Sequence, residues 1–393
     1  MHLVIVSPFP PEITGVGQYG YHITRTLVQS GMFSRITVLA GSHRNGPTPD
    51  HLGLTEIEYC WEPGQLSTRR TILSRLKRLN PDLVWFNVRV GMFGGSPWLS
   101  MSGLSTVIST RRMGYPTVVT LHEMVELYDL QTLNAPGGPL ARWGARLLTD
   151  IAIQADVVCL TMRHYVDWLT TKRPSVTCVH IPHGMYDKPL LLNNSDRTEL
   201  LLFNMLAPYK GLELLLEVFP SLKLEFPDLQ LTIAGAEHPR FPGYVRTVKG
   251  RFVDLDGVQW LGQVREEDVI ELFRCAQIVV LPYTASTGSS SVLCRAATWG
   301  RPVVASNLAE IRTFAHENNF QIEFFENGNA ESLRNAIQIL LASPSRRFTQ
   351  AQNNFEAIQD LRPEITCHRY LQAFNHALER RQSTKRIPLL ESA

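Results

Sequence analysis

A chain of 393 residues is too long for one ordinary hydrophobic core, so two domains are expected. Its composition, 44% hydrophobic and 19% charged, is that of a globular protein and excludes a long disordered tail. The formal net charge of +2 is close to neutral, which argues against nucleic acid as a partner.

The cysteines and the apolar stretches limit the cellular location. The six cysteines are scattered without a CxxC spacing, so the sequence indicates neither a metal site nor a disulfide framework. The N-terminus has no basic region, its apolar run is too short for a signal peptide, and no stretch approaches the roughly 18 apolar residues of a membrane span. We therefore expect a cytoplasmic protein.

Short β-branched runs alternate with helical patterns along the whole chain, which is typical of parallel sheets covered by helices. Their near-continuous apolarity suits strands that are buried on both faces. Strands are predicted at residues 2–8, 35–41, 82–87, 116–122, 155–161 and 176–182, and, after a linker at 186–198, at 200–206, 229–236, 257–263, 276–283, 301–306 and 321–325. The sequence thus predicts an α/β protein with two doubly wound, Rossmann-like domains.

The last helical pattern follows Pro363 and precedes no further strand. We expect this helix to cross back onto the first domain. The predicted domains are therefore residues 1–187 completed by 364–382, and residues 188–363, followed by a loose tail at 383–393.

A basic amphipathic helix is predicted within residues 67–84. Its cations are Arg69, Arg70, Arg75, Lys77 and Arg78. A solvated helix face is the simpler interpretation, and docking onto an anionic lipid surface or an acidic acceptor is the alternative. Peripheral contact with the inner membrane surface therefore stays open.

The loop after the first predicted strand holds Gly15 and Gly17 just before a helix. Glycines let the backbone approach a ligand closely, and the amides at a helix start favour an anion. The spacing of "GVGQYG" matches a dinucleotide fingerprint, but no acidic residue ends the second strand to hold a ribose. NAD binding is therefore disfavoured.

Three further loops follow predicted strands, where doubly wound sheets bind their ligands. His122 follows one strand, and for a lone histidine in this place a structural and a functional role are equally supported. Lys210 opens a helix, where a cation opposes the macrodipole unless an anion is bound. The amides and hydroxyls of the loop from Thr287 to Ser291 could hold a diphosphate without a metal. Together these loops suggest a cleft for a nucleotide diphosphate compound.

In this order, these pieces resemble the family 4 glycosyltransferases of the two-Rossmann-domain (GT-B) type. The similarity runs from "SPFPPEITGVGQYG" through "PYKGLELLLEVF", "LTIAGAE" and "PYTASTGSSSVLCRAATWGRPVVAS" to the C-terminal helix. It implies two domains that face each other across a cleft. It also implies a metal-independent, retaining transfer of a sugar from a UDP- or GDP-sugar to an acceptor hydroxyl, without a cofactor, in the biosynthesis of a glycan, glycolipid or glycoside.

The resemblance also implies roles for single residues. His122 would face the donor sugar and Lys210 would neutralise the diphosphate, and these are the expected catalytic residues. The expected donor-binding residues are Gly15, Gly17, Gly235, Glu237, Gly262, Val264, Thr287, Ser289, Ser290, Ser291 and Arg295. The acceptor is not identified by the sequence, and Phe93, Trp98 and Tyr128 are candidates to contact it.

This chain departs from most family members at two glutamate positions, and it also lacks the usual arginine of the first phosphate loop, where Met205 and Ala207 stand instead. Members usually carry a glutamate at each of the places that Thr287 and Arg295 occupy here, for contacts to the donor sugar and the ribose. A subset with a serine-rich loop lacks both, and the chain is most similar to that subset. The departure keeps two alternatives open: a catalytically inactive binding subunit, or another GT-B enzyme such as a nucleotide-sugar epimerase or a phosphorylase.

Overall fold

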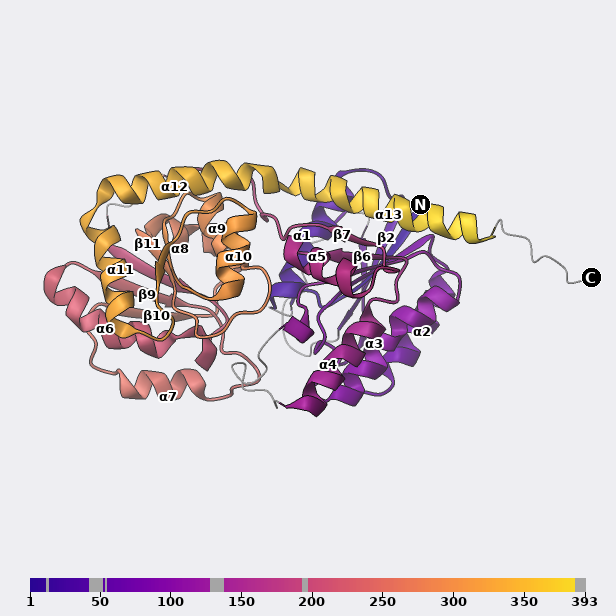
Figure 1. Cartoon of the computed structure of the whole chain (residues 1–393), viewed down its shortest axis with the longest axis horizontal. Helices are drawn as coiled ribbons and strands as arrows, with labels where there is room; N and C mark the ends of the chain where they lie inside the picture. Colours follow the sequence, from indigo (N-terminus) through magenta and orange to yellow (C-terminus); the bar gives the residue numbers. More distant parts are fainter. Residues whose placement is uncertain (12–13, 42–51, 54, 128–137, 193–196, 386–393) are drawn as a thin grey trace, which may run out of the picture. The chain divides into compact units, whose positions relative to one another are not determined.

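The computed structural model of the chain describes all residues except 12–13, 42–51, 54, 128–137, 193–196 and 386–393. The chain divides into two compact units. Unit 1 is formed by the chain up to Tyr186 together with the residues from Pro363 onward, and unit 2 by Asp187–Arg362 (Figure 1). Each unit is a parallel sheet covered by helices, so the predicted fold class is confirmed.

The described strands of unit 1 form one parallel sheet in the order β3-β2-β1-β4-β5-β6-β7. Its strands are β1 (His2–Ser7), β2 (Arg35–Gly41), β3 (Thr55–Trp61), β4 (Leu83–Val88), β5 (Thr117–Leu121), β6 (Val157–Leu160) and β7 (Cys178–His180). Its helices are α1 (Gly15–Gln29), α2 (Thr68–Leu79), α3 (Pro97–Arg112), the 3-10 turn η1 (Val125–Leu127), α4 (Pro139–Ala152), α5 (Arg163–Lys172) and α13 (Pro363–Lys385). Strands β1 and β4 lie at the centre and are almost entirely buried, as their apolar sequences predict.

Strand β3 is missing from the strands predicted by sequence. It lies at the edge of the sheet, where it pairs with β2. Glu56 and Glu58 alternate there with Ile57 and Tyr59. Charged side chains of this kind are common on edge strands, which other strands cover on one edge only. A search for continuous apolar runs overlooks such a strand.

The described strands of unit 2 form a second parallel sheet in the order β10-β9-β8-β11-β12-β13. Its strands are β8 (Glu199–Phe203), β9 (Gln230–Ala234), β10 (Val258–Gly262), β11 (Ile278–Leu281), β12 (Val303–Ser306) and β13 (Glu323–Phe325). Its helices are α6 (Leu212–Glu225), α7 (Tyr244–Arg251), α8 (Val269–Cys275), α9 (Ser291–Thr298), α10 (Ala309–Glu317), α11 (Ala330–Ala342) and α12 (Pro344–Ile358), with the 3-10 turns η2 (Pro208–Lys210), η3 (Glu266–Asp268) and η4 (Gln359–Leu361).

Both sheets reverse their strand order once. The chain starts at a central strand, moves to one edge, and then returns to fill the other side. The reversal falls between β1 and β4 in unit 1 and between β8 and β11 in unit 2. Loops diverge at such a switch point, which makes its carboxyl end the place where doubly wound sheets bind ligands.

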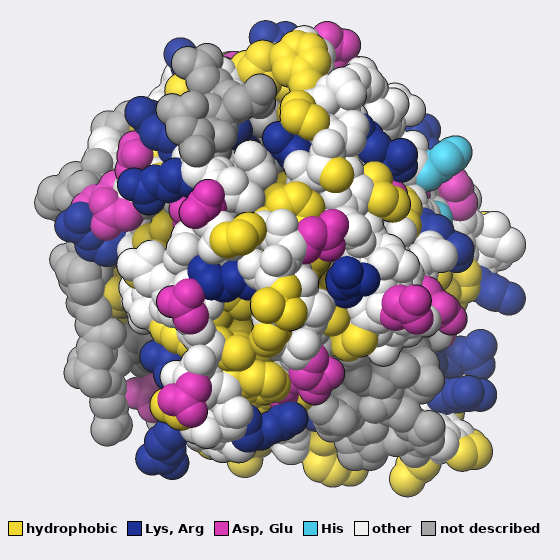
Figure 2. Space-filling model, turned by 90° about the vertical axis from the view of Figure 1, so that its left-hand side faces the viewer, with side chains coloured by type: hydrophobic (Ala, Val, Ile, Leu, Met, Phe, Trp, Pro, Cys, Tyr) yellow, Lys and Arg dark blue, Asp and Glu magenta, His cyan; other side chains and the backbone are white. Residues whose placement is uncertain are grey.

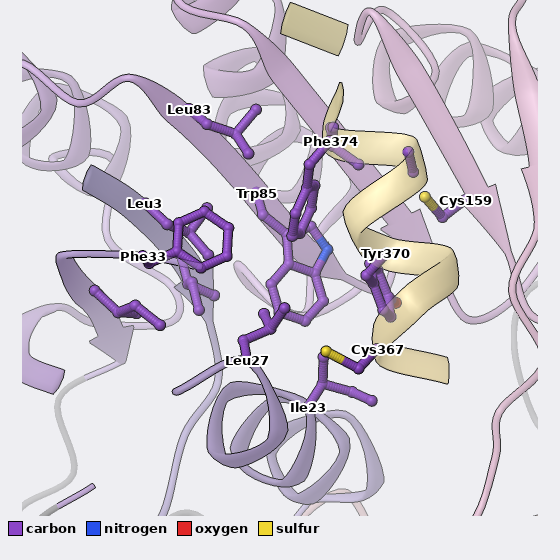
Figure 3. Packing of buried hydrophobic residues seen from close by; sticks show 14 of the residues in the cluster. Leu3, Ile23, Leu27, Phe33, Leu83, Trp85, Cys159, Cys367, Tyr370 and Phe374 are labelled. Carbon is purple, nitrogen blue, oxygen red and sulfur yellow. The ribbon is translucent and has the colours of Figure 1, made fainter. Parts of the chain in front are cut away.

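The last helix, α13, packs into the core of unit 1. Figure 3 shows Tyr370 and Phe374 on this helix beside Trp85 of β4. The Tyr370 hydroxyl lies 2.7 Å from the hydroxyl of Tyr19 on α1 and 2.9 Å from that of Thr120 on β5. The expected return of the last helix to the first domain is thus confirmed.

A buried carboxylate also ties α13 to unit 1. Asp156, just before β6, is 3% exposed and accepts hydrogen bonds from three donors. Arg381 of α13 donates Nε to Oδ2 at 2.9 Å, and Arg111 of α3 donates Nε to Oδ1 at 3.0 Å. The backbone amide of Thr117 donates to Oδ2 at 3.0 Å. One acidic side chain thus joins α13 to a helix and a strand that lie far away in the sequence.

The surface shown in Figure 2 mixes basic, acidic and hydrophobic side chains, consistent with the nearly neutral net charge. None of the helices in the described part of the chain is both long and apolar enough to cross a membrane. The six cysteines all lie within the described residues, and they are free thiols.

Candidate functional site

The loops that follow β8 and β11 meet at the switch point of unit 2. After β8 the chain forms the turn η2, and Gly211 then starts α6 with a φ of +69°. A Cβ atom on Gly211 would lie 1.7 Å from the carbonyl oxygen of Pro282, the residue after β11. The amide of Thr284 also donates to the Tyr209 carbonyl at 3.0 Å. The two backbones therefore touch, and only glycine fits between them.

Lys210 lies in this contact. Its ammonium is 4.0 Å from the centre of the Tyr283 ring and 5.5 Å from that of Tyr209. No carboxylate of the described residues forms an ion pair with it. Burial lowers the pKa of Lys210 from its ordinary value to about 8. A cation held against ring faces without an acidic partner is suited to an anionic ligand.

Tyr283 connects the two loops. It is buried, and its hydroxyl accepts a hydrogen bond from Asn204 of the β8 loop, with Ser290 at the start of α9 nearby. Sequence reasoning treated this tyrosine only as the end of a strand. The sequence feature that could have identified Tyr283 is its position directly after "VVLP" and beside the hydroxyl-rich loop.

The hydroxyl-rich loop ends in helix α9, one residue earlier than the sequence suggested. Ser290 is its N-cap and accepts a hydrogen bond from the Leu293 amide at 3.3 Å. The first turn of α9 has no acidic side chain. Four residues of the loop and helix start are partly exposed and therefore accessible to a ligand: Thr287, Ser289, Ser290 and Ser291.

The loops after β9 and β10 are adjacent to the β8 loop. Gly235 has a φ of +134°, and a Cβ atom there would lie 1.5 Å from the Asn204 carbonyl oxygen. Its amide donates to the carbonyl of Gly262 at 2.6 Å. Gly262 is exposed and Val264 is half-buried. The structure thus brings these predicted donor residues to the same edge of the sheet as Lys210.

The carboxylate of Glu237 is bonded to two backbone amides. Its Oε1 accepts from the amide of Gly243 and its Oε2 from the amide of Val245, both at 2.8 Å. These amides lie at the N-terminus of α7 and lower the pKa of the carboxyl. Glu237 therefore acts as a helix cap, and we leave it out of the proposed donor site.

Arg295 is 6% exposed and forms an ion pair with Glu266 of η3, while its guanidinium lies 5.7 Å from the centre of the Phe203 ring. This interaction joins α9 to the loop after β10 within unit 2. We therefore assign Arg295 a structural role beside the donor site.

The glycine loop of unit 1 begins α1. Thr14 is the N-cap and accepts from the Gly17 amide at 3.0 Å, so that amide already has a partner. Gly15 has open space around its Cβ position. A Cβ atom on Gly20 would lie 2.5 Å from Oγ of Ser7 and 2.9 Å from Nδ2 of Asn87. The third glycine of "GVGQYG" is therefore needed to pack α1 against β1 and β4.

His122 follows β5 and is partly exposed. Its Nε2 lies 2.6 Å from Oδ1 of Asn87, the last residue but one of β4. The Tyr19 ring stands edge-on at 4.7 Å between centres. Burial, and to a smaller extent the nearby His183 and Arg89, lower the pKa of His122 to about 3. The imidazole is therefore neutral near pH 7.

Comparisons with known proteins agree with this architecture. Residues 197–343 match the family model of the glycosyl transferases group 1. The chain is 26% identical over 370 residues to a phosphatidyl-myo-inositol mannosyltransferase of Mycobacterium leprae, covering 91% of this chain and 92% of that protein. It is 28% identical over 283 residues to an uncharacterized glycosyltransferase of Bacillus subtilis, covering 72% of each.

Solved structures share the fold over nearly the whole chain. Sucrose-phosphate synthase from Thermosynechococcus elongatus superposes with a TM-score of 0.73 at 16% identity, covering 97% of this chain and 100% of that one. HepE of Anabaena, solved in complex with UDP and glucose, superposes with a TM-score of 0.71 at 15% identity, covering 95% and 99%. These similarities show a shared two-domain fold, and the family match to the glycosyl transferases group 1 lies within unit 2.

The remaining candidates differ in exposure. Phe93 is buried against Trp61, whereas Trp98 is 76% exposed at the start of α3. Tyr128 lies outside the described residues.

Among the described residues, no cluster of His, Cys, Asp or Glu could hold a metal ion. Sequence reasoning missed Asn87, although it is the single amide in the apolar strand "LVWFNV".

Proposed function

We propose that the protein is a retaining glycosyltransferase that moves a sugar from a UDP- or GDP-sugar to an acceptor hydroxyl without a bound metal. The observation that carries the proposal is the position of Lys210. Its ammonium, which has no acidic partner among the described residues, lies where the β8 and β11 loops meet. That is the switch point of a sheet whose sequence matches the glycosyl transferases group 1.

The residues around Lys210 have distinct tasks in this proposal. Lys210 neutralises the donor diphosphate, and the free amides at the start of α9 bind its oxygens. The hydroxyls of Thr287 and Ser289 add hydrogen bonds. The base of the nucleotide lies near Gly235, Gly262 and Val264 at the ends of β9 and β10. In unit 1, His122 and the glycine loop with Gly15 and Gly17 serve the donor sugar and the acceptor.

The proposed chemistry needs no nucleophile from the protein. The bond between the sugar C1 and the diphosphate oxygen breaks, and the acceptor oxygen bonds to C1 on the same face. The acceptor proton passes to an oxygen of the departing diphosphate. The protein mainly stabilises the charge that develops on that diphosphate, and removing one such contact typically costs about 100- to 1,000-fold in rate.

The first test is thermal stabilisation of the purified chain by UDP, GDP, ADP and their sugars, with and without EDTA. We expect one nucleotide to raise the melting temperature, unaffected by EDTA, and to identify the base. Lys210→Ala should weaken this binding by about 10- to 100-fold, the cost of a lost hydrogen bond to a charged group. Binding of no nucleotide would contradict the proposal.

Product analysis with the nucleotide sugar that binds distinguishes the alternatives. Transfer to an acceptor, with the anomeric configuration of the donor kept, supports the retaining transferase. Inversion would contradict the proposed mechanism. Binding without transfer would indicate a binding subunit, and conversion of the donor sugar into its epimer would indicate an epimerase.

Unit 1 also has a surface suited to a peripheral membrane contact. Large exposed apolar side chains lie at the N-terminal ends of α2, α3 and α4: Leu66, Trp98, Leu140 and Trp143. The three helices pack side by side (Figure 1), and each starts at the carboxyl edge of the sheet. Exposed Arg70 and Arg142 lie on the same helix ends. Apolar and basic side chains together favour an anionic lipid surface.

Helix α2 alone does not supply this surface. Its apolar residues Ile72 and Leu76 are buried, and Arg75 and Arg78 both pair with Glu58 of β3. We propose that the exposed helix ends dock the protein on anionic lipid. Sedimentation with vesicles of phosphatidylcholine, with and without an anionic lipid, tests this. Trp143→Ser should reduce binding, whereas Leu224→Ser, an exposed leucine of unit 2, should not.

A further inference from the structure

A chain of hydrogen bonds connects the ends of three strands in unit 1. Asn87, near the end of β4, is fully buried. Its side-chain amide bonds to β1, to α1 and to the residue that follows β5. Its Nδ2 donates to Oγ of Ser7 and to the carbonyl of Val16, both at 2.9 Å. Its Oδ1 lies 2.6 Å from Nε2 of His122. None of these contacts was expected from the sequence.

The orientation of the Asn87 amide follows from its partners. The Val16 carbonyl can only accept, so the amide group that faces it must be the NH2. The Ser7 hydroxyl donates to the Pro8 carbonyl at 2.6 Å, and it therefore accepts from Asn87. A flipped amide would place two acceptors against each other at Val16. Oδ1 is thus fixed toward His122.

The protonation of His122 follows in turn. Oδ1 is an acceptor, so Nε2 of His122 must carry the proton that it donates. A neutral imidazole carries one proton, which leaves Nδ1 with a lone pair. No described residue is bonded to Nδ1. The titratable and charged groups around the ring are Tyr19, His183 and Arg89.

We propose that Asn87 is a positioning residue that holds His122 as the neutral imidazole protonated on Nε2, so that Nδ1 accepts a hydrogen bond from a hydroxyl of the bound sugar. The tautomer follows from contacts within unit 1, whereas the sugar contact rests on the proposed function. Through the Val16 carbonyl the same amide is bonded to the first turn of α1. The Asn87 side chain therefore positions both the start of the glycine-rich helix and His122.

The tautomer can be measured without any assay of activity. In the full chain labelled with 15N-histidine, two-bond proton–nitrogen NMR spectra distinguish the two neutral tautomers and the imidazolium. The His122 signal is assigned by its loss in His122→Gln. At pH 7 we expect protonated Nε2 and unprotonated Nδ1. Protonated Nδ1, or an imidazolium, would overturn the proposal.

Variants test whether Asn87 causes this state. In Asn87→Ala the tautomer preference should be lost, and transfer should fall by about 10- to 100-fold, as expected when a hydrogen bond to a buried group is removed. Ser7→Ala is the matched control: it removes one of the two acceptors of the Asn87 Nδ2 group, and the Val16 carbonyl still fixes the amide, so the tautomer should stay. An unchanged tautomer in Asn87→Ala would overturn the role of Asn87.

Asn87→Asp gives a second readout that a purely structural role would not change. A carboxylate beside Nε2 stabilises the imidazolium and raises the pKa of His122. In the imidazolium Nδ1 carries a proton and cannot accept a hydrogen bond from the sugar. Transfer by this variant should therefore decline as the pH falls through the raised pKa. The wild type should lack this decline, and the same profile in both would contradict the sugar contact. If the NMR result holds but no donor is transferred, the proposed function fails and the tautomer assignment remains.

Discussion

The ammonium of Lys210 lies 4.0 Å from the centre of the Tyr283 ring, and the hydroxyl of that ring accepts a hydrogen bond from Asn204, with Ser290 nearby. One aromatic side chain thus supports the cation and links the β8 loop to the start of α9. Lys210 is half-buried, and this burial lowers the pKa of its ammonium. Charge, position and protonation of this lysine therefore have a common structural cause.

The lowered pKa of Lys210 predicts that nucleotide binding depends on pH. The ammonium loses its proton as the pH rises through about 8, so the affinity for a diphosphate should fall between pH 7 and 9. Isothermal titration calorimetry across this range with the nucleotide that binds measures the effect. Lys210→Arg should bind without this pH dependence, because arginine stays charged. A wild-type affinity that is constant from pH 7 to 9 would exclude Lys210 from the diphosphate site.

The close packing at Gly20 predicts a large effect of one methyl group. In Gly20→Ala the new Cβ would lie 2.5 Å from Oγ of Ser7, and we expect a loss of about 1 to 3 kcal/mol in the free energy of unfolding, as in other overpacked cores. Gly144→Ala in α4 is the matched control, since nothing lies within 4 Å of its Cβ position. It should be neutral or stabilise by up to about 1 kcal/mol. Chemical denaturation of both variants gives the comparison, and equal effects would refute the packing argument.

The position of Glu237 predicts an effect on folding with little effect on the donor. Glu237→Gln should destabilise unit 2 at neutral pH, because the charged carboxylate caps α7 through two amides. The folded-state pKa is lowered, so the stabilisation is present above the ordinary pKa of a glutamate and is lost as the pH falls through the lowered value. The difference from the wild type should therefore shrink in acid, as thermal unfolding from pH 7 to pH 3 can show. A tenfold loss of nucleotide affinity in a fully folded variant would instead place Glu237 in the donor site.

The carboxylate of Asp156 predicts that α13 depends on it. In Asp156→Asn the charge that Arg111 and Arg381 share is lost, and we expect about 1.5 to 3 kcal/mol of destabilisation, the range for hydrogen bonds to charged groups. Amide exchange should rise in α13 before it rises in unit 2. Glu58→Gln, which affects a more exposed pair on β3, is the control and should cost less than about 1 kcal/mol. A similar cost for both variants would show that the buried carboxylate has no special role.

Much of the fold follows from local sequence patterns. Buried parallel strands need apolar runs, and the chain predicts β1, β4, β8 and β11 because their side chains face helices on both sides. Strand β3 was not predicted from the sequence, because an edge strand tolerates alternating charged side chains. The sequence could also indicate which loops carry polar residues, since loops after parallel strands share one edge of the sheet.

The sequence by itself determined the two doubly wound domains and the loops in which Lys210 and Ser290 lie. Only the tertiary structure decided what single side chains do there. Glu237 caps a helix, Arg295 pairs with Glu266, and Asn87 bonds to His122. The physical reason is that strand periodicity is a local property, whereas a hydrogen bond or an ion pair depends on partners that only folding brings within about 3 Å.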